Sequence, residues 1–179
     1  MKHSWIALCA ATLALAGCGG TFETTFDAPV AASVSQTWTL EDVTVTVPNE
    51  LTVSDRNLFA PDADIVWHGE AAGDRRAQVR AIVETGVAGG AAGLAGATPV
   101  DIEVTLIRFH AVTPRAVARA PSAVHNIAYT ARVVDAETGA VLVPAQRIDA
   151  DLEANVGSAA LAAANEGQTQ KVRITAHIA

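Results

Sequence analysis

Four residues near the start of the sequence, Leu15-Ala16-Gly17-Cys18, carry the clearest chemical signal in the chain. They close an apolar run that begins after a positive Lys2, which is the order of a secretory signal peptide. Small residues directly before a cysteine at this depth are typical of a lipobox, where a bacterial cell attaches a diacylglyceryl group to the thiol and cleaves before it. The pattern predicts lipidation of Cys18, with the three preceding residues as the recognition signal.

The apolar run is too short to be a transmembrane anchor, because a spanning helix needs about 20 apolar residues. An ordinary secretory peptide with an incidental Cys18 is the alternative. Two or more acyl chains, of the palmitate type, would hold the mature chain on a membrane. Gly19 follows the cysteine, whereas Asp there is the usual signal for the inner membrane. We therefore expect a lipid-anchored protein of the bacterial cell envelope, on the outer membrane and facing the periplasm.

The mature chain offers few groups for covalent catalysis. Cys9 leaves with the signal peptide and Cys18 carries lipid, so no thiol remains for a disulfide, a metal or a nucleophile. There is no Gly-x-Ser-x-Gly motif, and Ser122 lies near His125 in the sequence without a placed acid. We expect no enzyme activity and no cofactor.

Charge limits the choice of partners. The formal net charge is −7, and loss of Lys2 with the signal peptide leaves 11 Lys+Arg against 19 Asp+Glu, a balance of −8. An acidic chain without a basic patch would be repelled by nucleic acid. The expected partners are the membrane, through the lipid on Cys18, and another envelope protein.

An acidic cluster surrounds the apolar triplet at 65–67. Carboxylates and imidazole at Asp62, Asp64, His68 and Glu70 are suitable metal ligands, but the HExxH and calcium-loop spacings are missing. A solvated strand end is the favoured interpretation, and no metal site is predicted.

Two histidines, His110 and His125, fall at facing ends of two predicted strands. As cross-strand neighbours they could bind a metal or sense pH, since an unperturbed imidazole titrates near 6.5. Partly exposed sheet residues are the favoured interpretation.

Glycines at Gly89, Gly90 and Gly93 superficially resemble a phosphate loop. A phosphate loop follows a strand and opens a helix, whereas this segment follows a predicted helix and leads into a strand. A structural connection is favoured. The sharper hypothesis is that these three glycines contact a partner or lipid.

Hydrophobic periodicity predicts the elements. Strands are expected at 38–47 with a bulge near its start, 51–53, 65–67, 100–110, 124–134, 141–143 and, beyond a bulge or edge position at Pro144, 148–152, with a last strand at 172–178. Helices are expected from the N-cap Asp74 into 86–96 and at 158–165. The fold class is α+β: a mainly antiparallel sheet with one or two helices packed on one face. The expected organisation is a signal peptide at 1–17, the lipidated cysteine and a flexible tether at 18–36, and one domain at 37–179.

Four stretches carry a resemblance to known proteins. Residues 63–69 (ADIVWHG), 73–79 (GDRRAQV), 104–110 (VTLIRFH) and 135–141 (DAETGAV) resemble an uncharacterised family of short bacterial envelope lipoproteins. The likeness covers most of 38–178 and implies no catalytic residues. More loosely, the order of elements is similar to accessory lipoproteins of envelope machines, such as transport auxiliaries and activators of wall synthesis.

Three functions follow in order. The first is a non-catalytic binding or scaffolding lipoprotein, tethered through Cys18, whose domain docks on another envelope protein. The second is a small-molecule or lipid-binding auxiliary of an envelope transport system, with a cleft between the glycine-rich segment and the sheet. An enzyme comes third.

Overall fold

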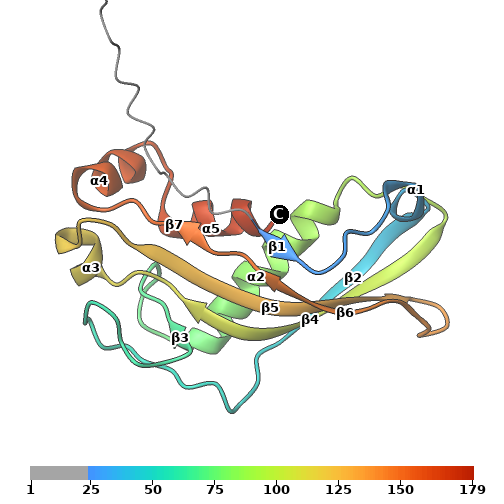
Figure 1. The fold of residues 1–179 in the computed structure, drawn as a ribbon, viewed down its shortest axis with the longest axis horizontal. Helices are drawn as coiled ribbons and strands as arrows, with labels where there is room; N and C mark the ends of the chain where they lie inside the picture. The colour runs from blue at the N-terminus through green and yellow to red at the C-terminus, as the bar shows by residue number, and fades with distance from the viewer. Residues whose placement is uncertain (1–23) are drawn as a thin grey trace, which may run out of the picture.

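The computed structural model describes residues 24–179, which form a twisted sheet with helices packed against it (Figure 1). The strands are β1 (Thr25–Phe26), β2 (Trp38–Thr46), β3 (Ile65–Val66), β4 (Thr98–His110), β5 (Val124–Asp135), β6 (Val141–Asp149) and β7 (Leu152–Glu153). The helices are α1 (Ala32–Ser35), α2 (Arg75–Ala91), α3 (Pro114–Arg119), α4 (Gly157–Asn165) and α5 (Gln170–Ile178). The predicted α+β class is confirmed.

The long strands β4 and β5 form the centre of the sheet, whose strand order is β1-β6-β5-β4-β2. β4, β5 and β6 make the predicted antiparallel meander, joined after β5 by a turn in which Gly139 has a φ of 72°. β2 and β3 run parallel to β4. The sequence did not indicate this parallel pairing, because alternation shows which side chains share a face but not the direction of the neighbouring strand.

Two predicted irregularities are confirmed. The register between β2 and β4 shifts between Leu40 and Asp42. On β6, the pairing with β5 shifts between Ala131 and Val133, and the extra residues opposite this step include Pro144. Because proline cannot donate to a ladder, a bulge on an exposed edge accommodates it.

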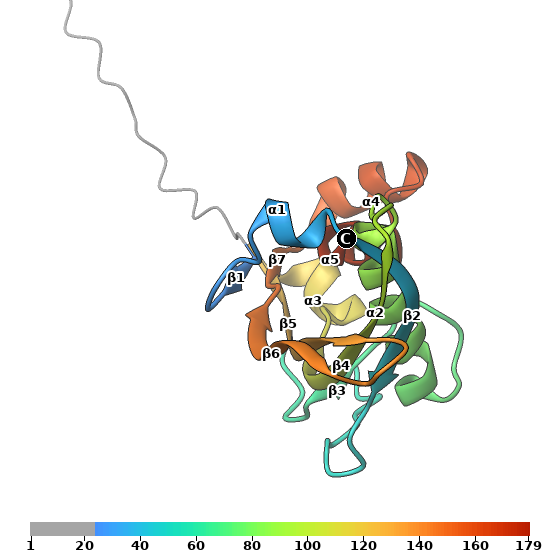
Figure 2. The same ribbon diagram turned by 90° about the vertical axis from the view of Figure 1, so that its right-hand side faces the viewer.

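The core lies between the sheet and the pair of helices α2 and α5 (Figure 2). α2 begins at the predicted N-cap, where the side chain of Asp74 accepts the Ala77 N–H at 3.1 Å. Its apolar stripe, Val79, Ile82 and Val83, has no exposed surface. Gly86 faces α5, and a Cβ there would lie 2.7 Å from Ile178. The missing side chain therefore lets the two helices approach closely.

The prediction of a strand at 172–178 is wrong, because these residues belong to α5. Thr169 caps this helix by accepting the Val172 N–H at 3.3 Å. Ile174 and Ile178 are buried, whereas Val172 is exposed. Positions four apart share a face in both a strand and a helix, so a short alternating run does not distinguish them.

Smaller elements also differ from the sequence expectation. β1, α1 and α3 were not predicted, and the expected strand at 51–53 is reduced to one bridge between Val53 and Ile65. β1 and α1 fall within the segment predicted as a flexible tether. β1 pairs with β6 through Thr25↔Asp149 and Phe26↔Ile148. The described part of that segment is therefore ordered against the domain.

Candidate functional site

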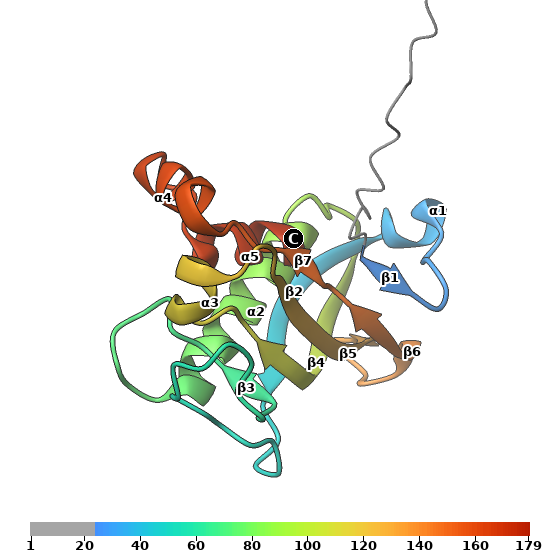
Figure 3. The ribbon, with the colours of Figure 1, turned by 60° about the vertical axis from the view of Figure 1, so that its left-hand side comes forward.

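An apolar groove of about 470 Å³ opens on the helical side of the sheet. Its floor comes from β4, β5 and β6, and its walls from the C-terminal half of α2, the end of α5 and residues 25–36, which we call the strap. Figure 3 shows the end of α5 near β1 and α1, so the two ends of the described chain meet at this place. The volume falls in the usual range of small-molecule sites, about 300–1,000 Å³.

Strand alternation explains the composition of the floor. Tyr129, Ala131 and Val133 are alternate residues of β5 and face the groove, as do Val100 and Ile102 of β4. α2 covers the other part of this face and ends at Ala91, while Ala131 contributes only a methyl group to the floor. The groove is the part of the apolar face that the helices leave open.

Very few polar groups reach the groove. No charged side chain lines it, and its polar side chains are Ser35, Trp38, Tyr129 and Gln146. Tyr129 is 3% exposed, and burial raises the pKa of its hydroxyl to about 12. The hydroxyl is therefore protonated at neutral pH, and it has no hydrogen-bond partner among residues 24–179. A buried donor in this position favours a ligand that brings an acceptor.

The strap closes one side of the groove. Gln146 on β6 accepts the Ala28 N–H at 3.0 Å, next to the two-residue pairing of β1 with β6. The strap keeps three apolar side chains in water, with Phe26 51%, Val30 37% and Val34 47% exposed. These residues extend the apolar surface from the groove to the outside of the molecule.

The three glycines proposed as a contact site occupy different environments. Gly90 lines the groove, and a Cβ there would overlap the main chain of Ala179. Gly89 has only ordinary contact distance to Ala179, and a Cβ on Gly93 would meet nothing within 4 Å. Of the three, Gly90 is thus the residue that the structure places at the groove.

The acidic cluster does not converge. Asp64 accepts both the N–H and the hydroxyl of Thr52 at 2.8 Å, and these bonds lower the pKa of Asp64. Glu70 binds Lys171 at 2.7 Å and the Trp67 indole N–H at 2.9 Å, and the Lys171 bond is the main cause of its lowered pKa. Within 24–179 no group of three or more His, Cys, Asp or Glu residues could hold a metal ion.

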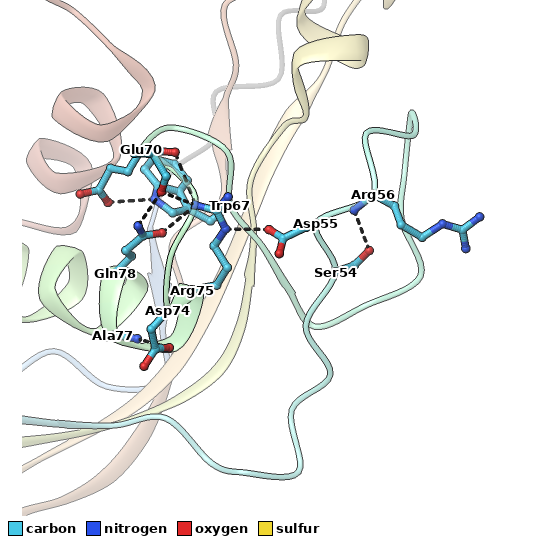
Figure 4. A network of polar contacts seen from close by, with 10 residues as sticks. Ser54, Asp55, Arg56, Trp67, Glu70, Asp74, Arg75, Ala77 and Gln78 are labelled. Carbon is cyan, nitrogen blue, oxygen red and sulfur yellow. Dashed lines mark hydrogen bonds and ion pairs between the residues drawn. The ribbon is translucent and has the colours of Figure 1, made fainter.

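A buried arginine dominates the polar contacts in this region (Figure 4). Arg75 is 7% exposed, and its guanidinium donates to Asp55 at 2.7 Å, Gln78 at 2.8 Å and the Ala71 carbonyl at 3.1 Å. The guanidinium thus ties the loop before α2 to the loop after β2. These bonds use the arginine as a structural clamp rather than leaving it free for a ligand.

The two histidines do not pair across the strands. His110 lies opposite Asn126 in the β4·β5 register, so His125 points to the other face of the sheet. His125 has no exposed surface, and its Nδ1 accepts the Val112 N–H at 3.2 Å. Burial, together with the charge of Arg173, lowers the pKa of His125 to about 4.

We expect acid to destabilise the protein through His125. The unfolded histidine titrates near 6.5, so between about pH 6.5 and 4 the unfolded chain binds a proton that the folded chain does not. The free energy of unfolding therefore falls across this window as the pH drops. Urea unfolding at a series of pH values should show that His125→Gln flattens the fall, while the partly exposed control His110→Gln keeps most of it. An unchanged slope in His125→Gln would contradict this assignment.

The residues of the lipid signal, Leu15, Ala16, Gly17 and Cys18, lie outside the described residues, so lipidation stays a prediction. From residue 24 onward, no helix has the length and apolar character needed to cross a membrane.

Sequence reasoning anticipated the place of the groove but missed most of its residues. It expected a cleft between the glycine-rich segment and the sheet. It did not include the strap, nor Tyr129, Gln146 and the end of α5, because these come together only through long-range packing. The apolar residues of the strap, Phe26, Val30 and Val34, were the signal that could have indicated a docked segment.

Comparison with known proteins gives a family but no activity. The sequence model of a family of unknown function, DUF6778, matches residues 38–179. No curated protein matches the sequence significantly. Among solved structures, a provisionally named lipoprotein from Caulobacter crescentus CB15 shows 14% identity and a TM-score of 0.35, over 76% of this chain and 80% of that chain. The family match spans everything from the start of β2 onward.

Proposed function

The chain belongs to the DUF6778 family, whose function is unknown, and on that premise we propose that it is a lipid-anchored, non-catalytic protein of the bacterial envelope that binds an apolar ligand. Acyl chains on Cys18 tether it to the membrane, on the outer membrane and facing the periplasm. The groove is the binding site.

The groove of about 470 Å³ is the observation that supports ligand binding. The sequence placed docking on another envelope protein first and a small-molecule or lipid auxiliary second. A concave site with an apolar floor, small residues and a few polar groups is what small-molecule sites require, so the geometry favours the second of these functions.

An uncharged fluorescent probe tests this proposal. We expect 1-N-phenylnaphthylamine to bind saturably to the full chain carrying Cys18→Ser, which removes the lipid. Ala131→Trp should fill the groove and weaken binding about tenfold or more. Ala145→Trp is the matched control, because Ala145 is exposed on β6 and does not line the groove. Equal binding by both tryptophan variants, or none by the parent, would contradict the proposal.

Docking of a partner strand is the second candidate. β6 pairs with β1 only at Ile148 and Asp149, which leaves the rest of its outer edge open. Val141 and Leu142 are 54% and 40% exposed on this edge. An open edge can accept a strand of another protein. Pro144 interrupts the edge and blunts it, which ranks this candidate below ligand binding.

A further inference from the structure

We infer that the occupant of the groove is one acyl chain of a bilayer lipid, with the ester carbonyl next to that chain accepting the Tyr129 hydroxyl. This inference rests on the proposed function and names the ligand class of the same site. Three independent features of the described residues carry it: the lining, the unpartnered donor and the position of the strap.

The lining selects a long, uncharged, apolar group. Val87, Leu94, Val133, Val143 and Ile148 present methyl and methylene groups from α2, the segment after it, β5 and β6. A charged group in this space would find no side chain of opposite charge and would lose its hydration. A methylene chain loses nothing of this kind and gains from leaving water.

The Tyr129 hydroxyl gives the occupant one polar requirement. The donor lies on a strand in the floor, is almost fully buried and lacks a partner in residues 24–179. A plain hydrocarbon would leave it unsatisfied, which is costly. An ester carbonyl at the head of an acyl chain supplies the missing acceptor, and the rest of the head group remains outside, where the groove is open.

The strap places the groove beside the bilayer. Cys18 precedes Phe26 by eight residues, which span at most about 29 Å when fully extended. The mouth of the groove therefore lies within that distance of an anchored Cys18. The exposed Phe26, Val30 and Val34 present an apolar surface on this same segment, as expected for a part of the molecule that meets a lipid interface.

The chain comes from a second lipid rather than from the anchor. One acyl chain alone gives only marginal membrane binding, whereas two chains anchor stably. A diacylglyceryl anchor that placed one chain in the groove would leave a single chain in the bilayer. Neighbouring lipids supply the same chemistry without this loss.

Photocrosslinking of the full, acylated chain tests the inference. The protein is reconstituted in vesicles of phosphatidylethanolamine and phosphatidylglycerol, with a trace of phosphatidylethanolamine that carries a diazirine at the end of one acyl chain. After irradiation, peptide mass spectrometry maps the adducts. We expect them on the floor and on the segment that includes Leu94. Ala131→Trp should reduce them about tenfold, and Ala145→Trp by less than about twofold.

Further variants keep the test decisive. Leu94→Glu places a charge at the groove from a segment outside helices and strands, and it should reduce adducts as Ala131→Trp does even if the tryptophan variant fails to fold. Tyr129→Phe should reduce them a few-fold, whereas a purely packing role of Tyr129 would leave them unchanged and overturn the hydrogen bond.

The outcomes separate this inference from the proposed function. Probe binding by the unacylated chain, with no groove adducts from vesicle lipid, would overturn the acyl-chain assignment and leave the apolar site intact. Loss of both would overturn both. Groove adducts that form only from a photoreactive fatty acid incorporated on Cys18 itself would show that the anchor is the occupant, against our inference.

Discussion

Replacing Cys18 with serine is expected to move the protein from the membrane fraction to the soluble fraction. Each buried methylene contributes about 0.8 kcal/mol to membrane binding, and two acyl chains together give an attachment that does not reverse on the time scale of fractionation. Serine cannot carry the thioether-linked lipid, and no described helix could replace the anchor. We therefore expect a near-complete redistribution, measured by ultracentrifugation together with labelled palmitate incorporation.

The chain offers a matched control for this change. Cys9 lies in the predicted signal peptide, so Cys9→Ser should leave both membrane association and palmitate labelling unchanged. If the serine variant at Cys18 stayed in the membrane fraction, the anchor would have to be something other than this lipid.

Replacing Trp67 with alanine should cause the largest loss of stability of any single change considered. Trp67 has no exposed surface and meets Phe109 edge-on, with ring centroids 5.7 Å apart. Its indole N–H binds Glu70, and Gly69 packs so closely on the ring that a Cβ there would overlap it. Truncating a buried aromatic residue to alanine costs about 3–5 kcal/mol, because burial is lost and a cavity remains.

Urea unfolding of the full chain measures this loss. The control is Phe59→Ala, since Phe59 is 51% exposed and its ring is covered by the Arg115 guanidinium at 5.0 Å. A cation–π contact at an exposed site is worth about 0.5–1 kcal/mol, so this variant should lose far less stability. Similar losses in the two variants would mean that Trp67 is not the packing centre shown here.

Sequence periodicity predicted the long elements because each has one clear face. β4 and β5 alternate over many residues, and α2 combines a cap at Asp74 with a stripe of branched side chains. α5 was missed because Ile174 and Ile178 are compatible with both a strand and a helix. The decisive feature, packing against Gly86, depends on a residue almost ninety positions away.

The candidate site was predictable only in outline. The glycine-rich segment and the sheet are adjacent in the sequence, so a cleft between them could be expected. The strap is more than a hundred residues from its partner Gln146, and no local pattern links the two. The single tyrosine, Tyr129, looks in the sequence like any residue of a buried strand. Its unpartnered hydroxyl is evident only from the packing around it.

Mass spectrometry of the protein gently extracted from its own membranes is the most direct test of the account. Intact and native spectra of one sample report the N-terminus and any non-covalent ligand together. We predict a mature chain that begins at an acylated Cys18 and carries one bound apolar molecule, which is lost in Ala131→Trp. An unmodified N-terminus with no bound molecule would contradict both the anchor and the groove.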